Sequence, residues 1–245
     1  MRFSDRSEAG RQLAQALEHY RGEDVVVLAL VRGGLPVAAE IATHLRAPLD
    51  LVLVRKIGVP WHRELAMGAV VNAQKPIVVR EEDVIALAHV SEAEFEAACE
   101  REIAEIERRG DVYFGARAPL DIANRIVIVV DDGIATGSTI RAAVAGIKER
   151  QPTKIVVAIP VASPKAVAAL RGEVDEVCCL LLPSQMDAIG CFYEDFLNWT
   201  TTMSSVCWQP PTLRMSVGDS HPRCFRRRFD HRFVLAMPDR ITIPW

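Results

Sequence analysis

Continuous apolar runs alternate with amphipathic stretches along the first three quarters of the chain. A helix is predicted near the N-terminus, where apolar residues from Ala9 to Tyr20 recur at three- and four-residue steps. Buried strands are predicted at residues 24–30, 49–54, 126–130, 155–161 and 174–182, and helices at 35–45, 91–109, 138–150 and after Ser163-Pro164. Because strands that alternate with helices form parallel sheets covered on both faces, the pattern predicts an α/β fold with an open parallel sheet flanked by helices.

The stretch from Ile57 to Met67 follows neither the helical nor the strand period. It contains Gly58, Pro60 and mixed polar residues, so we predict a long exposed loop, followed by short strands at 69–71 and 77–79. Residues from about 57 to 110 are therefore expected to form an inserted loop and helical region within the main domain.

The last fifth of the chain does not continue the alternation. Residues 197–245 hold five prolines and three of the four tryptophans, and the part from 201 to 245 has seven Arg and three Asp but no Lys or Glu. That part carries a charge of +4, so the rest carries −7 of the total −3. We predict a domain over 1–196 and an irregular tail over 197–245, and a divergent extension, an added interaction segment and a shifted reading frame all stay open as its origin.

The composition is that of a soluble globular protein, with 50% apolar and 25% charged residues. No apolar run reaches the length of a membrane span and no signal segment follows Met1, so we expect a cytoplasmic protein without a membrane partner. The six cysteines lack zinc-site spacing and are expected to be reduced. The small negative net charge gives no overall attraction to nucleic acid, so we expect no nucleic-acid partner.

The most informative segment runs from Val127 to Thr139, where a buried strand ends in two acids and passes through a loop of small residues into a helix. Free amides at the helix start, the helix dipole and the hydroxyls of the loop suit a phosphate group. Two carboxylates beside a phosphate are tolerable when they contact hydroxyls or a cation, which ribose and Mg²⁺ would supply. The segment lacks the Walker A lysine and the dinucleotide-binding glycine pattern, so a phosphosugar site is favoured over a solvated strand-turn-helix joint.

This segment resembles the signature of type I phosphoribosyltransferases for 5-phosphoribosyl-1-pyrophosphate (PRPP), with Gly133 as a departure. The resemblance covers about residues 1–196 and points to a poorly characterised bacterial branch of phosphoribosyltransferase-domain proteins. It implies that Asp131 and Asp132 contact the ribose hydroxyls, stabilise positive charge on the sugar and hold Mg²⁺ directly or through water and ribose hydroxyls. The 5-phosphate would be held by Ala135, Thr136, Gly137, Ser138 and Thr139.

Three further segments resemble the other functional loops of the family. Arg32, Gly33 and Gly34 follow the first strand like the pyrophosphate loop, although two glycines after a strand are often only a turn. The segment from Arg55 to Gly68 resembles the flexible loop that closes over the site, with Arg55 and Lys56 as catalytic contacts to the diphosphate. His62, Arg63 and Glu64 would approach the reacting centre, and a solvated charged loop is the alternative.

The acceptor side would be formed by Phe192 and Tyr193, either stacked on a ring or packed in the core.

The resemblance implies a Mg²⁺-dependent pentosyltransferase of nucleotide metabolism, with a small hood, that moves the 5-phosphoribosyl group from PRPP to a nitrogen nucleophile and releases pyrophosphate. A nucleobase is the expected acceptor, and the family makes a homodimer plausible. Ala135 stands where the 6-oxopurine branch has an acid, which argues against hypoxanthine and guanine. Two alternatives stay open: a PRPP- or nucleotide-sensing regulator with little turnover, and a degenerate binder whose acceptor site the tail has replaced.

Overall fold

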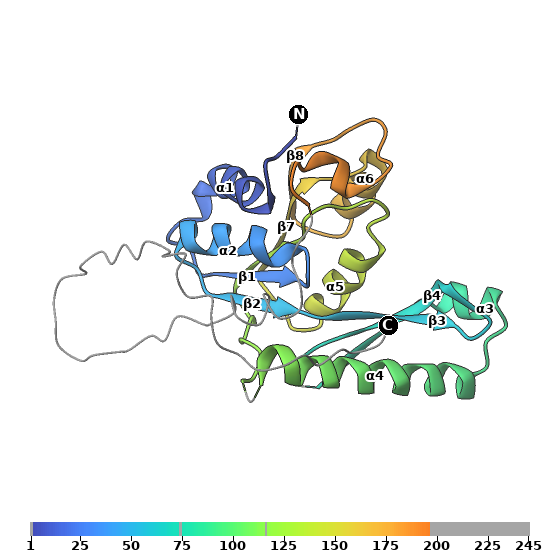
Figure 1. Ribbon diagram of the computed structural model, residues 1–245. Coiled ribbons are helices and arrows are strands. Elements are labelled where there is room, and N and C mark those ends of the chain that lie inside the picture. The colour runs from blue at the N-terminus through green and yellow to red at the C-terminus, as the bar shows by residue number, and fades with distance from the viewer. Residues whose placement is uncertain (1, 74, 116, 197–245) are drawn as a thin grey trace, which may run out of the picture. The chain divides into compact units, whose positions relative to one another are not determined.

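A computed structural model describes residues 2–73, 75–115 and 117–196 (Figure 1). The predicted tail over 197–245 lies outside these residues. Within them, no helix is long and apolar enough to cross a membrane. The elements are α1 (Arg6–Ala16), η1 (Glu18–Tyr20), β1 (Val25–Leu30), α2 (Gly34–Leu45), β2 (Leu49–Val52), β3 (Val54–Val59), β4 (His62–Val71), β5 (Ile77–Arg80), α3 (Glu82–Leu87), α4 (Glu92–Phe114), β6 (Ile126–Val130), α5 (Ser138–Lys148), β7 (Lys154–Val161), α6 (Pro164–Arg171), β8 (Glu176–Leu181) and η2 (Ile189–Phe192).

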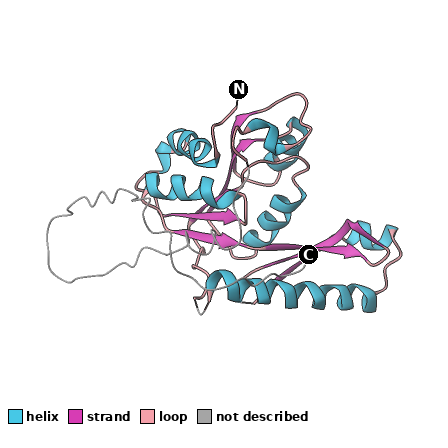
Figure 2. Cartoon of the chain, viewed as in Figure 1, coloured by secondary structure: helices cyan, strands magenta, loops and turns pink. Residues whose placement is uncertain are grey.

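Five strands form the predicted parallel sheet, in the order β2-β1-β6-β7-β8 (Figure 2). Their side chains alternate between two cores. In β1, Val25, Val27 and Ala29 pack with α1 and α2, whereas Val26, Leu28 and Leu30 share a core with α5 and α6. Figure 1 shows these two pairs of helices on opposite sides of the sheet. The predicted fold class is confirmed, and both faces of the central strands are buried as their unbroken apolar runs indicated.

The predicted loop from Ile57 to Met67 is wrong, because these residues form most of an antiparallel hairpin of β3 and β4, which β5 extends to three strands. The side chains of Ile57, Val59 and Met67 are fully buried. Residues 60–65 between them are exposed and include His62, Arg63 and Glu64, so no alternation of buried and exposed residues is visible there in the sequence. The register also shifts on both sides of Gly58, which pairs with Ala66 while Val59 pairs with His62, as at a β-bulge.

The hairpin is a direct continuation of the parallel sheet. Leu53 alone separates β2 from β3. Asn72 fixes this junction, because its side-chain oxygen accepts from Leu53 N at 2.5 Å and its backbone N–H donates to Leu53 O at 3.1 Å. The hairpin contacts both α4 and α5, and Figure 1 shows it between these two helices. Helix α4 starts at the predicted capping box of Ser91 and Glu94 but continues to Phe114, beyond the expected end.

Candidate functional site

The segment from β6 to α5 has the predicted order of strand, small-residue loop and helix. The loop is fixed to the end of β7: Ile134 N donates to Val161 O at 2.9 Å, and Ser163 Oγ donates to Ala135 O at 2.7 Å. Gly137 has φ +82°, a conformation that favours glycine, and helix α5 begins at the next residue. The loop therefore opens beyond the carboxyl end of a central strand, where ligands of open α/β sheets bind.

A pocket of about 230 Å³ lies over this loop. Residues 131–140 and Ile189 line it, so all five residues predicted to hold a phosphate border one cavity. Thr136 and Ser138 hydroxyls lie 3.3 Å apart, and the first amides of α5 adjoin them. Hydroxyl donors, helix amides and the positive end of the helix dipole together form a site that can bind an anion.

The two adjacent acids have different surroundings. Asp132 is buried, and its Oδ2 accepts from Arg6 Nε at 2.9 Å and lies 2.7 Å from Arg6 Nη2. Asp131 is half-buried and its Oδ1 accepts from the amide of Asp132 at 2.9 Å. Burial, and then the negative charge of Asp132, raise the pKa of Asp131 well above its usual range. Both acids line the pocket over the phosphate loop, where a cation or ligand hydroxyls would stabilise the Asp131 carboxylate.

The predicted pyrophosphate loop lies directly beside these acids. The peptide bond between Val31 and Arg32 is cis, and α2 begins at Gly34. A β-carbon at Gly33 would overlap the Asp132 carboxylate, and one at Gly34 would overlap the carbonyl oxygen of Val130. Two glycines are thus required where two loops, separated by about a hundred residues in the sequence, come into contact.

The predicted flexible-loop residues are carried by the hairpin. A pocket of about 600 Å³ between the hairpin and α4 is lined by Lys56, Arg63 and Glu64 and reaches Thr139 of the phosphate loop. A second pocket, of about 440 Å³, is lined by Lys56 and by Ser138 at the start of α5. Lys56 is therefore the predicted diphosphate contact that borders both cavities. His62 lines neither of these two pockets, and its Nδ1 accepts from Leu65 N at 3.2 Å within the hairpin.

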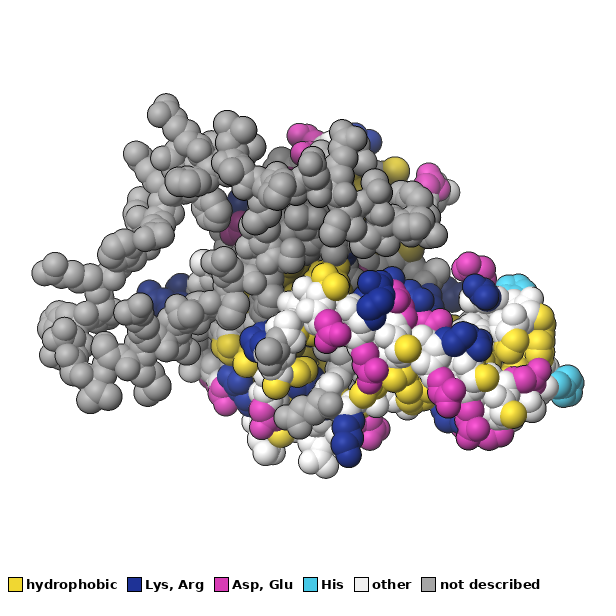
Figure 3. Space-filling model, turned by 60° about the horizontal axis from the view of Figure 1, so that its bottom comes forward, with side chains coloured by type: hydrophobic (Ala, Val, Ile, Leu, Met, Phe, Trp, Pro, Cys, Tyr) yellow, Lys and Arg dark blue, Asp and Glu magenta, His cyan; other side chains and the backbone are white. Residues whose placement is uncertain are grey.

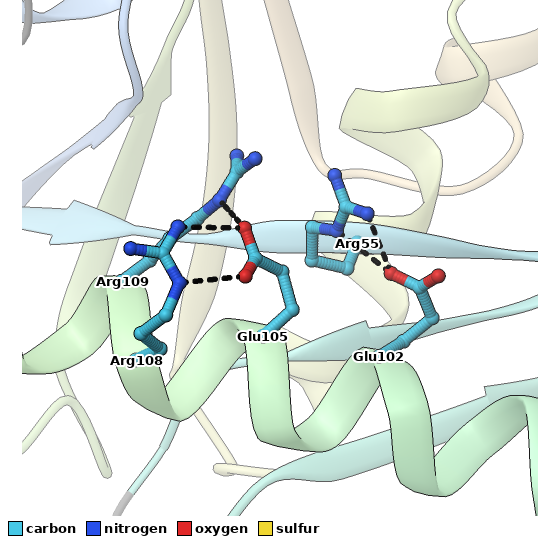
Figure 4. Close-up of polar contacts among 5 residues, drawn as sticks. All are labelled: Arg55, Glu102, Glu105, Arg108 and Arg109. Atoms are coloured by element: carbon cyan, nitrogen blue, oxygen red, sulfur yellow. Dashed lines mark hydrogen bonds and ion pairs between the residues drawn. The ribbon is translucent and has the colours of Figure 1, made fainter. Parts of the chain in front are cut away.

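Arg55 lines the cavity between the hairpin and α4, but its side chain is paired with α4. Its Nε and Nη2 lie 2.8 and 2.7 Å from Glu102 Oε2 (Figure 4). One turn further along the helix, Glu105 accepts from Arg108 and Arg109, so carboxylates on α4 bind arginines from two elements. The sequence could not indicate the Arg55 contact, because the partner is 47 positions away. In this conformation the Arg55 guanidinium is paired within the protein.

The residues predicted for the acceptor side are packed in the domain. Tyr193 is 4% exposed and its hydroxyl donates to the carbonyl oxygen of Asp132 at 2.5 Å, while its ring lies 5.6 Å from that of Phe3. Of the two interpretations, the structure therefore shows the packed one for Tyr193. Phe192 is half-buried against the same cluster. From this segment it is Ile189, which the sequence did not single out, that lines the phosphate pocket.

Arg6 is the site residue that sequence reasoning missed. It is the first residue of α1, next to the N-cap Asp5, and only 9% of it is exposed. An arginine in the first turn of an amphipathic helix is normally solvated, so no pattern in the sequence separates it from the other surface arginines.

The residues of the site fit a Mg²⁺ ion that is bound jointly by the protein and a substrate, rather than one that is enclosed by protein ligands alone. Among the described residues there is no group of three or more His, Cys, Asp or Glu that could hold a metal. Mg²⁺ is commonly bound through one or two carboxylates together with the phosphates of a substrate. The half-buried Asp131, at the edge of a phosphate-sized pocket, matches that mode.

Charged side chains of both signs lie on the face of the described residues that Figure 3 shows, with Lys and Arg next to Asp and Glu.

Comparison with known proteins places the site in a family. The model of the phosphoribosyl transferase domain matches residues 6–191. Two Mycobacterium tuberculosis proteins, from strains CDC 1551 and H37Rv and provisionally named phosphoribosyl transferases, are 42% identical over 194 residues. This is 79% of the present chain and 43% of theirs, so the chain spans less than half the length of these relatives. The crystal structure of TT1426 from Thermus thermophilus is similar with a TM-score of 0.75 and 38% identity, covering 84% of this chain and 97% of that one.

Proposed function

Because the chain belongs to the phosphoribosyl transferase domain family, we propose that it binds PRPP together with Mg²⁺ at the pocket between β6 and α5. It transfers the 5-phosphoribosyl group to a nitrogen nucleophile, of the nucleobase class, and releases pyrophosphate. The observation that carries this proposal is the meeting of the phosphate loop, Asp131 and the Gly33-Gly34 turn at one end of the sheet.

Each part of PRPP has a matching group in this arrangement. The 5-phosphate binds to the loop from Ala135 to Thr139, which supplies hydroxyls and the free amides at the start of the helix. The ribose hydroxyls bind the carboxylate of Asp131. The diphosphate extends toward the turn at Arg32 and toward Lys56, which borders the start of α5.

The reaction is a displacement at the anomeric carbon of the sugar. The bond from that carbon to the diphosphate oxygen breaks and its electron pair leaves with the diphosphate, while the nucleophile's lone pair forms the new carbon-nitrogen bond. The proton of the attacking N–H group leaves to water or to the departing diphosphate. Positive charge that develops on the sugar is stabilised by the nearby carboxylate of Asp131, and Lys56 and Arg32 stabilise the departing diphosphate. When bound, Mg²⁺ would neutralise part of the diphosphate charge.

The acceptor class rests on Ala135. This residue is exposed at the loop and carries only a methyl group where an acid would assist a 6-oxopurine. Adenine or another nucleobase without a 6-oxo group is therefore proposed before hypoxanthine or guanine.

Calorimetric titration with PRPP, with and without Mg²⁺, tests the binding part. We expect metal-dependent binding that Asp131→Asn weakens by at least about tenfold, or about 1.4 kcal/mol. Asp83→Asn, the same change at an exposed position of α3, is the matched control and should bind as the wild type does. Absence of any binding to the wild type would refute the proposal.

A screen of nucleobases for pyrophosphate release tests the reaction. Release with adenine but not with hypoxanthine is the expected result. PRPP binding without release for any base would instead favour the regulator that senses PRPP or a nucleotide.

A further inference from the structure

A large apolar side chain from outside the loop borders the phosphate pocket. Ile134 and Ile140 of the loop and helix also line this pocket, but they belong to the core and are only 3% and 1% exposed. Ile189, the first residue of η2, is half-buried instead. The other residues around the cavity are acids, residues with hydroxyl groups, glycines and Ala135. Ile189 therefore offers a ligand in this pocket an apolar surface of some size.

Ile189 lies directly against Gly133, the residue that follows the two acids. A β-carbon at Gly133 would be 2.6 Å from Cγ2 of Ile189 and 3.2 Å from its Cγ1, and 3.0 Å from Cγ1 of Val161. The φ of Gly133 is not positive, so its backbone conformation does not demand a glycine. The close approach of Ile189 does. The side chain of Ile189 thus occupies the space that a side chain at position 133 would take.

The segment that carries Ile189 is fixed beside the pocket. Phe3 N donates to Phe192 O at 2.9 Å, so the N-terminal segment is paired with the end of η2. The Tyr193 hydroxyl donates to the carbonyl oxygen of Asp132 at 2.5 Å, which connects the same segment to the phosphate loop. Ile189 packs against the apolar cluster that Phe3 and Tyr193 form. The apolar surface at the pocket is therefore part of a well-packed structure.

An aliphatic side chain can contact only certain parts of the reactants favourably. It has no group that donates or accepts a hydrogen bond, so it cannot pair with a phosphate, a ribose hydroxyl or Mg²⁺. A nucleobase differs from these groups, because the face of its ring gains free energy from apolar contact. Gly133 comes between the acids proposed for the ribose and the loop proposed for the 5-phosphate, so Ile189 is next to the sugar end of the pocket.

From this geometry we propose that Ile189 is a specificity-determining residue of the acceptor site: its side chain, in the space left by Gly133, packs against the face of the nucleobase ring that receives the phosphoribosyl group. The inference rests on the proposed function and deepens it. It assigns the apolar wall of the acceptor site to the start of η2, whereas the sequence pointed to Phe192 and Tyr193. Such a wall selects a planar ring, and the product nucleotide makes the same contact as the free base.

Calorimetric titration of the full chain with two ligands separates the ring from the rest of the substrate. Adenosine 5′-monophosphate (AMP), the product expected from adenine, carries a ring, whereas PRPP does not. Ile189→Ala removes three carbon atoms and should raise the Kd for AMP about tenfold, while the Kd for PRPP with Mg²⁺ stays unchanged. The control is Met186→Ala, which trims the same apolar cluster but does not border the phosphate pocket, and both Kd values should stay unchanged.

Gly133→Ala tests whether the two positions share one space. Alone, the new methyl group would overlap Ile189, displace its side chain and weaken the binding of AMP. Combined with Ile189→Ala, the methyl group enters the space that the isoleucine has vacated. The two changes together should therefore raise the Kd for AMP by less than the product of their separate effects. Independent effects would contradict the inference.

Three further results would overturn it. Equal losses of AMP and PRPP binding in Ile189→Ala would show that the residue only supports the shape of the pocket. An unchanged Kd for AMP in that variant would show that no ring lies against it, and so would a wild type that binds PRPP but not AMP. If Ile189→Ala does not fold, Ile189→Val replaces it, with an expected rise of about two- to threefold for AMP alone. A wild type that binds neither ligand refutes the proposed function itself.

Discussion

Gly34 gives the sharpest test of how the two loops meet. It begins α2 directly behind the end of β6. A β-carbon added there would overlap the carbonyl oxygen of Val130 and lie 3.1 Å from its carbonyl carbon and 2.9 Å from Cα of Asp131. All three atoms belong to the backbone at the end of β6 and the residue that follows it, so no side-chain rotation can relieve the contact.

Gly34→Ala should therefore force α2 and the end of β6 apart. Overpacking of this kind costs about 1–3 kcal/mol, and here the shift falls on the backbone of Asp131. We expect a lower midpoint of urea unfolding and weaker binding of PRPP in the same variant. The matched control is Gly110→Ala within α4, where the new methyl would lie 3.8 Å from Phe114 and the helix should gain about 0.5–1 kcal/mol.

The opposite signs make the comparison decisive. If Gly34→Ala unfolds at the wild-type urea concentration and binds PRPP equally well, α2 does not approach β6 as closely as described. A loss of stability at Gly110 comparable to that at Gly34 would show that glycine replacement destabilises this chain for another reason.

Two further predictions follow from perturbed titrations. Hydrogen bonds from Arg108 and Arg109 lower the pKa of Glu105 from 4.5 to about 2, so its stabilisation is complete above pH 4.5 and is lost as the pH falls toward 2. Glu105→Gln should therefore cost up to about 1 kcal/mol at pH 7 and clearly less at pH 2, measured by chemical unfolding at both pH values, and an equal effect at both would contradict this. Burial raises the pKa of Cys178 to about 11, so at pH 8 it should be alkylated much more slowly than the exposed Cys191, by peptide mass mapping; equal rates would contradict its burial.

The parts of the site that sequence could predict are local in the chain. The order of strand, acids, small-residue loop and helix from Val127 to Thr139 depends on neighbours a few positions apart, and the structure reproduces it. The parallel sheet could also be predicted, because a strand buried on both faces is apolar at every position. The hairpin from Val54 to Val71 could not be predicted, because residues 60–65 at its outer end are exposed and show no alternation, and its register shifts at Gly58.

The different environments of the two acids could not be predicted from the sequence, because they depend on contacts across the fold. Asp131 and Asp132 are chemically identical and adjacent, and both were assigned the same role from the sequence. What separates them is Arg6, 126 positions away, and Tyr193, 61 positions away, which both bind Asp132. Both acids follow the end of β6 and line the phosphate pocket, but the fold pairs the Asp132 carboxylate with Arg6. The two members of an acid pair at the end of a buried strand should therefore be treated separately, and the role of each assigned only after its partners in the fold are known.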